Sequence, residues 1–196
     1  MSALTITVTH ELGLHPGRWI VDPHHSAVLF SIRHLGLAKV RGRFDRFETT
    51  LEVGPTLAET SVTAAIDLAS INTNNTDRDA HLRSTDFFST EEHPEMHFVS
   101  QGIRPAGEVW ELQGEVTLNG RTRPLTLEVE FNGVQEFPGQ NTRHAGFSAT
   151  GSLRRSEFGI EFGLLPIGMD TLALGDEVKI ELDLEFVEPQ DDHAMA

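Results

Sequence analysis

Apolar and polar residues alternate with a period of two along most of this chain. In residues 109–118, for example, Trp110 and Leu112 fall on one face of the segment, and Glu111 and Gln113 fall on the other. Such alternation is typical of antiparallel strands that bury one face and expose the other to water. The pattern predicts strands at 26–33, 40–53, 61–68, 96–104, 109–118, 125–131, 145–154 and 177–187. Many short strands separated by turn residues favour an all-β fold, and we expect a closed antiparallel barrel of about eight strands.

Two glycines carry signals for the path of the backbone. Asn119-Gly120 is a dipeptide that favours a type I′ turn, so we expect a hairpin there, with the link lengthened as far as Pro124. Gly42 is expected to bend the long strand 40–53, because glycine inside a strand often marks a bend or a bulge.

One segment, 76–87, breaks the alternation and predicts a single short helix. Thr76 is suited to be its N-cap, and acidic residues follow in the first turn, where the helix dipole favours negative charge. Arg78, Asp79 and His81 on this helix have two interpretations: they bind a ligand headgroup, or they pin the helix to the barrel through caps and ion pairs. We favour the second interpretation and expect no catalytic role for them.

No linker divides the chain, so we expect one barrel domain at 19–188, preceded by an extension at 1–18 and followed by a loose tail at 189–196. Within the extension, residues 5–9 alternate as one further strand would. The first seventeen residues contain no Lys or Arg and no long apolar run, and no stretch approaches the roughly 18 apolar residues of a membrane span. We therefore expect a cytoplasmic protein without stable membrane insertion.

Charge argues against one class of partner. Fifteen Lys and Arg face thirty Asp and Glu, which gives a formal net charge of -15 at pH 7. Such a surface repels the phosphates of nucleic acids and anionic lipid headgroups at long range, and we expect no nucleic-acid partner. The chain has no cysteine, which removes disulfides, thiolate metal sites and thiol nucleophiles together.

The inward-facing positions decide whether the barrel is filled or hollow. A barrel of about eight strands can just be filled by its side chains, or holds one small ligand when those side chains are small. A glycine in mid-strand is explained equally well by a bulge, but several small residues together favour a dry apolar cavity. At about 0.8 kcal/mol per buried CH₂, ten buried carbons supply roughly 8 kcal/mol, the scale of micromolar binding before entropic costs. The small inward positions are Ala64, Ser100, Gly102, Gly114, Ala149 and Gly151.

Several motifs in order resemble the YceI-like family. The family's opening hairpin, with a His-Leu-Gly turn and a Val-x-Gly-x-Phe strand, resembles LFSIRHLGLAKVRGRF at 29–44. The chain departs from the family at Asn119, where histidine is frequent, and at Glu157, where aspartate is usual. The resemblance covers about residues 19–187. Its later motifs are ASINT at 69–73, RDAHLRS at 78–84, DFF at 86–88, Pro94, Phe98, LNG at 118–120, RPLTL at 123–127, SEFG at 156–159 and GDEV at 175–178.

The resemblance implies an eight-stranded lipocalin-like barrel with a short helix near one mouth. It implies a non-enzymatic protein that sequesters or carries a polyisoprenoid, an isoprenoid quinone or another long amphiphile. No cofactor beyond that lipid is implied, and a homodimer is a further expectation. Many relatives look secreted or periplasmic, and the missing signal peptide departs from that.

We select ligand-binding candidates from the inward faces of the strands, from the helix and from the long 156–174 connection, which is suited to form a lid. Packing alone is an equally good explanation for each wall residue. The candidates are Phe30, Ile32, Ile66, Leu82, Phe87, Phe88, Phe98, Trp110, Leu112, Phe131, Phe147, Ala149, Gly151, Phe158, Leu164 and Leu182, with Ile160 and Leu165 as further mouth residues.

The alternative is a metal-dependent or hydrolytic enzyme that uses His34, His81 and His97 at one mouth. The spacing of the histidines does not favour it, since His93 and His97 on a strand would lie about 13 Å apart. The chain also lacks a P-loop, a dinucleotide fingerprint and an HExxH motif. A third interpretation is a partner-binding module whose pocket is filled.

A basic cluster stands out in this acidic chain. It has two interpretations: it binds a phosphate or diphosphate headgroup, or it forms cross-strand ion pairs with Asp45 and Glu48. We favour the ion pairs. The cluster consists of Arg33, Lys39, Arg41, Arg43 and Arg46.

Overall fold

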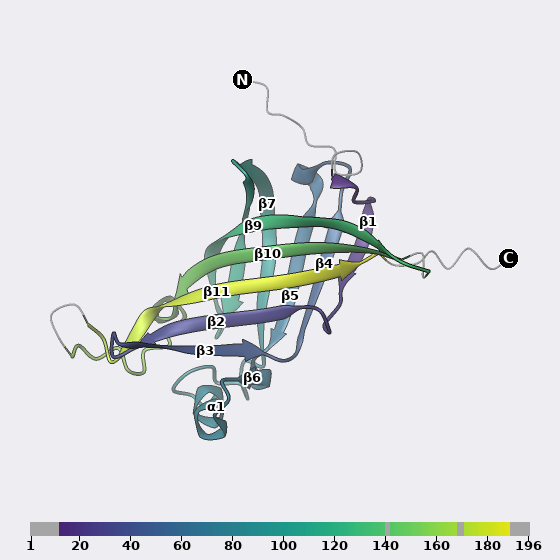
Figure 1. The fold of residues 1–196 in the computed structure, drawn as a ribbon. Helices are drawn as coiled ribbons and strands as arrows, with labels where there is room; N and C mark the ends of the chain where they lie inside the picture. Colours follow the sequence, from purple (N-terminus) through teal and green to yellow (C-terminus); the bar gives the residue numbers. More distant parts are fainter. Residues whose placement is uncertain (1–11, 140–141, 168–170, 189–196) are drawn as a thin grey trace.

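Eleven strand segments hydrogen-bond side by side. The first segment along the chain pairs with the last, which closes the sheet into a barrel (Figure 1). The computed structural model describes residues 12–139, 142–167 and 171–188. The segments are β1 (Gly17–Val21), β2 (Ala27–His34), β3 (Ala38–Phe44), β4 (Phe47–Val53), β5 (Ser61–Asp67), β6 (Ile71–Asn72), β7 (Glu95–Ala106), β8 (Val109–Leu118), β9 (Arg121–Phe137), β10 (Thr142–Arg154) and β11 (Leu174–Val187).

Three pairs of segments act as single strands that bend once. β1 leads into β2, β3 into β4, and β5 into β6 through a short 3-10 turn at Leu68–Ser70. The two segments of a bent strand pair with the two segments of the next bent strand. β4 pairs with β1 and β5, and β3 pairs with β2 and β6. The barrel therefore has eight antiparallel strands, which confirms the predicted fold class.

The long strand predicted at 40–53 does bend, but not at Gly42. The break lies at residues 45–46, where the Asp45 and Arg46 amides donate to the carbonyl and hydroxyl oxygens of Ser70. The glycine at position 42 is explained by a close contact instead of a bend, because a Cβ at this position would lie 2.3 Å from the Phe30 ring. Glycine is needed here so that the ring can lie across β3.

The predicted hairpin at 119–120 is confirmed, and its link is shorter than expected. Asn119 and Gly120 have φ of 49° and 69°, as a type I′ turn requires. β9 then starts at Arg121 and includes Pro124. Proline is tolerated there because β9 pairs with β10 only from Leu127 onward, so that part of the strand lies at an open edge.

One α-helix, α1 (Thr76–Arg83), follows β6, as predicted. Its N-cap is Asn75 and not Thr76, since the Asn75 side chain accepts a hydrogen bond from the Arg78 amide at 2.9 Å. The helix ends before residue 87, because turns occupy the segment that leads to β7. In the described ranges, no helix has the length and apolar character to cross a membrane.

The two ends of the barrel differ. One end carries α1, the β2–β3 hairpin and the connection from β10 to β11 (Figure 1). The opposite end is closed by a cluster that includes Leu14 and Trp19, which are 2% and 1% exposed. The Trp19 indole donates to the His15 carbonyl at 2.9 Å. The core thus begins inside the predicted extension, whereas residues 5–9 and the tail 189–196 lie outside the described residues.

Candidate ligand-binding cavity

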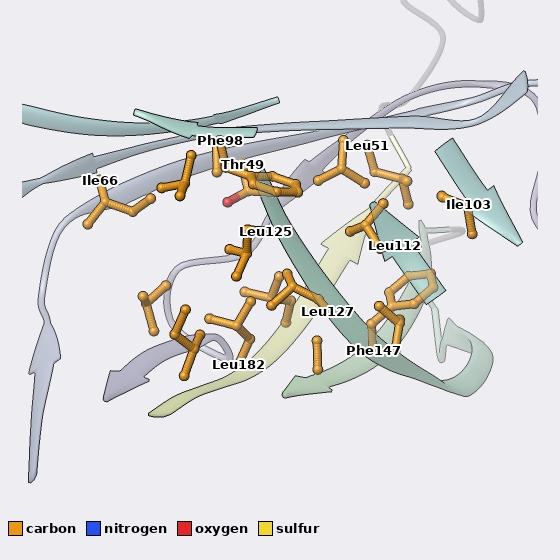
Figure 2. A pocket seen from close by; sticks show the side chains of 18 of the residues that line it. Thr49, Leu51, Ile66, Phe98, Ile103, Leu112, Leu125, Leu127, Phe147 and Leu182 are labelled. Atoms are coloured by element: carbon orange, nitrogen blue, oxygen red, sulfur yellow. The ribbon is translucent and has the colours of Figure 1, made fainter. Parts of the chain in front are cut away.

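An apolar cavity of about 170 Å³ lies inside the barrel. Side chains from opposite walls point into it, among them Ile66, Leu125 and Leu182 (Figure 2). Thr49 and Thr60 bring the only side-chain oxygens among its lining residues, and Thr60 uses its hydroxyl to donate to the Thr56 carbonyl. A space with this lining stays dry and accepts an apolar molecule.

The glycines predicted to face inward do not create this cavity, contrary to the sequence-based interpretation. Gly102 does not face inward, because a bulge after Ser100 shifts β7 and sets Gly102 opposite the exposed Gln113. A Cβ on Gly114 would lie 2.5 Å from the Phe98 ring, and a Cβ on Gly151 would lie 2.6 Å from a methyl of Leu127. Neighbouring side chains therefore fill the space that these glycines leave. Among the small inward residues, Ala64 and Ala149 line the cavity.

A second cavity of about 400 Å³ forms the mouth at the α1 end. Its floor adjoins the inner cavity, because Phe30 and Leu153 line both. Phe30 packs against Phe44, with ring centroids 5.6 Å apart, and Phe44 packs against Phe88 at 6.0 Å. Phe30 and Leu153 therefore stand between the mouth and the inner cavity, where an apolar chain would have to pass.

The polar residues of α1 mainly hold the helix in place. Arg78 donates from Nε to the Thr73 hydroxyl and from a terminal nitrogen to the Thr73 carbonyl, both at 2.7 Å. The buried Asp79 carboxylate accepts from the Thr73 amide at 2.9 Å. His81 Nε2 lies 2.8 Å from the Asp86 carboxylate. These contacts support the pinning interpretation, although Arg78 and His81 also line the mouth.

Arg155, which is 3% exposed, fixes the other side of the mouth. Its guanidinium donates to the carbonyls of Ile160, Phe162, Leu174 and Gly175 at 2.7–3.1 Å. Burial lowers the pKa of this guanidinium, and the charge of Asp176 opposes that shift. One cation therefore ties the start of the β10–β11 connection to its end.

This geometry agrees with the comparison of the sequence with known families. The model of the YceI-like domain matches residues 19–186. The chain belongs to the YceI-like family. A UPF0312 protein of Staphylococcus epidermidis is 38% identical over 166 residues, which are 84% of this chain and 94% of that protein.

Solved structures of other proteins share this YceI-like fold. BcnA of Burkholderia cenocepacia superposes with a TM-score of 0.71 at 24% identity, over 84% of this chain and 98% of BcnA. A polyisoprenoid-binding domain of Saccharophagus degradans, implicated in plant cell wall breakdown, gives a TM-score of 0.65 at 15% identity, over 89% of this chain and all of that domain. Identities this low support the fold and leave the ligand open.

Most of the predicted site residues of this YceI-like barrel surround the two cavities. The inner cavity is lined by Phe30, Ile66, Phe98, Trp110, Leu112, Phe147, Ala149 and Leu182. The mouth is lined by Phe30, Ile32, Leu82, Phe87 and Phe88, and also by Ile160. That these residues contact a ligand stays a prediction.

Four of the sixteen candidates, and the further mouth residue Leu165, do not line either cavity. Phe131 stacks on Trp110, with ring centroids 5.5 Å apart, and packs against the cluster that closes the opposite end. Gly151 is covered by Leu127. Phe158 is 1% exposed and packs in the core beneath the connection. Leu164 is half-buried within the connection, and Leu165 is 68% exposed.

Sequence reasoning missed several wall residues of both cavities. Alternation within the predicted strand 125–131 would have found Leu127, which continues the inward face of β9. Ile103 could not be found in this way, because it faces inward only through a bulge between Ser100 and Gly102 that shifts the register of β7. Alternation gave no signal for Leu14, which precedes β1, or for Arg155, which follows β10 directly. A buried arginine cannot be told from a surface arginine by its place in the sequence alone.

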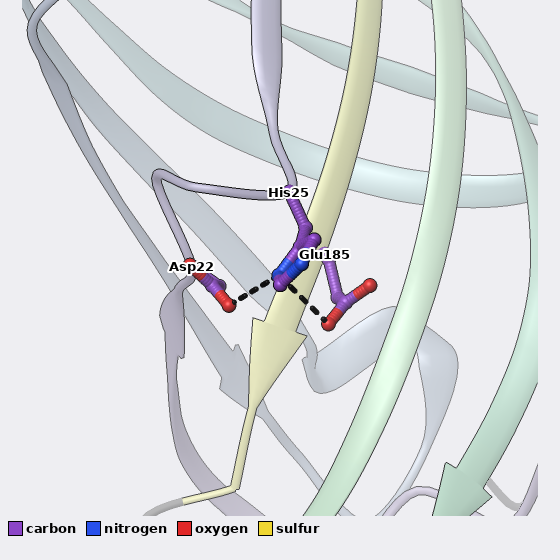
Figure 3. A group of neighbouring side chains, drawn as sticks. All are labelled: Asp22, His25 and Glu185. Atoms are coloured by element: carbon purple, nitrogen blue, oxygen red, sulfur yellow. Dashed lines mark hydrogen bonds and ion pairs between the residues drawn. The ribbon is translucent and has the colours of Figure 1, made fainter.

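The histidines are not gathered at the mouth as the enzyme alternative requires. His34 and His81 line the mouth, whereas His97 faces Glu95, with Nε2 3.4 Å from its carboxylate. Among the described residues, one group of potential metal ligands has its donor atoms within 4.8 Å of one another, and it consists of Asp22, His25 and Glu185 (Figure 3). This cluster lies at the β1–β2 bend beside β11, and none of its members lines either cavity.

The cluster ties the β1–β2 bend to β11 through ion pairs. His25 Nδ1 lies 2.8 Å from Asp22 and 3.8 Å from Glu185. Hydrogen bonding to Asp22, and the charges of Asp22 and Glu185, raise the pKa of His25 above its ordinary 6.5. The hydrogen bond from His25 likewise lowers the pKa of Asp22 below its ordinary 3.8. Both side chains are therefore charged between about pH 3.8 and pH 6.5.

We expect the pair to stabilise the fold within that pH window. The contribution of His25 is complete below pH about 6.5 and is lost as the pH rises through its higher folded pKa. The contribution of Asp22 is complete above pH about 4 and is lost as the pH falls through its lower folded pKa. NMR titration should give His25 a pKa above 6.5 that falls toward 6.5 in Asp22→Asn. Glu181→Gln, on the exposed face of β11, is the control, and an equal fall there would contradict the pairing.

Proposed function

We propose that this protein binds a long apolar amphiphile of the polyisoprenoid or isoprenoid quinone type, without catalysis. The observation that carries the proposal is the pair of adjoining cavities, with an inner one lined almost entirely by apolar side chains and a mouth that also contains charged groups. The inner cavity suits a hydrocarbon tail. The mouth, with Arg78 and His81, suits a polar headgroup.

Membership of the YceI-like family supports this proposal. The structural similarity to a polyisoprenoid-binding domain supports the ligand class, at the level of the fold. The binding energy needs no charged contact, because each buried CH₂ contributes about 0.8 kcal/mol. Sequestration or transport within the cytoplasm is the role that we propose for such a barrel.

Titration with straight-chain primary alcohols of increasing length tests the proposal. We expect the affinity to rise about fourfold for each added CH₂ and to level off once the two cavities are filled. Isothermal titration below the aggregation concentration of each alcohol measures this dependence. Isoprenols of matched length should follow the same curve if the cavities accept branched chains.

An affinity that does not depend on chain length would contradict burial in the barrel. The enzyme alternative makes a different prediction, namely stoichiometric metal in untagged protein purified without added metal. Replacing His34 and His81 with alanine would then release the metal. Under our proposal, the affinity of the same variants still rises with the length of the alkyl chain, because the inner cavity contains neither histidine.

A further inference from the structure

Large apolar side chains are exposed at the mouth end of the barrel. Leu35 and Leu37 at the tip of the β2–β3 hairpin are 39% and 82% exposed. Phe162, Leu165 and Ile167 in the β10–β11 connection are 48%, 68% and 52% exposed. We call these five residues the rim patch. Exposed apolar side chains that gather in one place mark a surface that meets an apolar partner.

The rim patch is one surface because backbone hydrogen bonds join its two segments. The Leu35 amide donates to the Ala173 carbonyl at 3.0 Å, and the Ala173 amide donates to the Leu165 carbonyl at 2.9 Å. The hairpin and the connection therefore project together beyond the barrel (Figure 1).

The patch is also continuous with the mouth cavity. Phe162 belongs to both, and its ring packs on Phe87 and His81, with centroids 5.2 Å and 4.8 Å apart. An apolar chain that leaves the mouth thus passes directly onto the rim patch.

Basic residues flank the patch in a protein that is otherwise strongly acidic. Arg33, Lys39 and Arg41 are exposed on the outer face of the hairpin, since Ile32 and Val40, which alternate with them, line the mouth. Arg33 stands directly opposite Lys39. Like charges in this position destabilise a sheet, so the pair suits an external anionic partner.

The rest of the basic cluster is already neutralised. Arg43 pairs with Asp45, and Arg46 pairs with Asp67, whereas Arg33 and Lys39 form no salt bridge with any residue that the structure describes. Ion pairs therefore form at the far end of the cluster and not at the tip of the hairpin, and Asp45 is the one predicted partner among them. Glu48 has no part in them among the described residues.

We propose that the rim patch docks on the surface of an anionic lipid bilayer, with the leucines in the interface and the hairpin cations over the headgroups. The inference rests on the proposed function, because a ligand buried in the barrel has to leave a membrane without crossing water. Docking of this kind is peripheral and reversible. It needs one apolar contact and one electrostatic contact, and the hairpin carries both.

Vesicle flotation with the full chain tests the docking. The probes are vesicles of phosphatidylcholine alone and of phosphatidylcholine mixed with phosphatidylglycerol. We expect flotation with the anionic vesicles, and at least about a tenfold loss of partitioning for Leu37→Glu and for Leu165→Glu. Val99→Glu is the matched control, since Val99 is 54% exposed on β7, outside the patch, and it should partition as the wild type does.

The cations are tested separately. Arg33→Gln and Lys39→Gln should each lower partitioning about fivefold on anionic vesicles and leave any partitioning on neutral vesicles unchanged. Arg18→Gln on β1, at the opposite end, is the matched control. Absence of flotation, or equal flotation of the rim variants and their controls, overturns the docking. The docking is also overturned if the wild-type protein has no affinity for vesicles and forms a soluble dimer that the Leu37→Glu substitution dissociates.

Alcohol titration of the same variants separates the docking from the proposed function. Loss of flotation with unchanged alcohol affinity in Leu37→Glu supports the docking, because it separates the rim from the cavity. If the wild-type protein binds alcohols but never floats, the docking is wrong and the proposed function stands. If the protein floats but binds no alcohol of any length, the barrel function is wrong, and the docking loses the role on which it rests.

Discussion

Ala149→Trp is expected to lower the affinity for long apolar ligands by about a hundredfold while the barrel stays folded. Ala149 lies on β10, is 7% exposed and lines the inner cavity. An indole at this position occupies much of the cavity of about 170 Å³. Excluding about four CH₂ groups of a ligand costs roughly 3 kcal/mol, and overpacking lowers the free energy of unfolding by about 1–3 kcal/mol. Alcohol titration and near-ultraviolet circular dichroism measure the two effects.

Ser152→Trp is the matched control, because Ser152 is exposed on the same strand. It should leave the affinity unchanged. A tryptophan at Gly151 should behave differently, since its Cβ already collides with Leu127 and with the Thr126 carbonyl. We therefore expect Gly151→Trp to destabilise the barrel instead of filling the cavity. A folded Ala149→Trp protein with wild-type affinity would contradict binding in the inner cavity.

Arg155→Leu is expected to lower the free energy of unfolding by about 3 kcal/mol or more. The substitution leaves the carbonyls of Ile160, Phe162, Leu174 and Gly175 without the donor that holds them. Each buried polar group that loses its partner costs about 1–3 kcal/mol. Urea unfolding measures the loss, and hydrogen exchange should show faster opening of the connection than of the strands.

Arg154→Leu, at the neighbouring exposed position, removes the same charge and should change the free energy of unfolding by less than about 1 kcal/mol. Similar losses for both variants would mean that charge alone, and not the four carbonyl contacts, stabilises the connection. The alcohol affinity of Arg155→Leu should also fall, because the buried guanidinium holds one wall of the mouth.

The strands could be predicted from the sequence because one face of each is buried and the other is wet. In β8, for example, Leu112 and Val116 are buried, and Gln113 and Glu115 are exposed, as the alternation requires. The bends could not be predicted in the same way. Asp45 and Arg46 break a strand through hydrogen bonds to Ser70, more than twenty positions away. The alternation of apolar and polar residues within one segment cannot predict such a distant partner.

The cavity could be predicted only in part, for a related reason. Strands that are distant in sequence line the same barrel interior. The space beside a small residue on one strand is therefore filled, or left open, depending on the side chain of the neighbouring strand. Gly114 accommodates Phe98, and Gly42 accommodates Phe30, whereas Ala149 faces open space. Leu14 closes the opposite end from a segment that has no alternation and gave no signal.

Native mass spectrometry of untagged protein from its own cells tests the central claim most directly. We predict a mass above that of the chain, with about one hydrocarbon amphiphile per barrel, released by organic solvent and identified as isoprenoid in type. A protein that carries no lipid, and that also fails to take up a long isoprenol added to it, would contradict the binding of a long apolar amphiphile in the barrel.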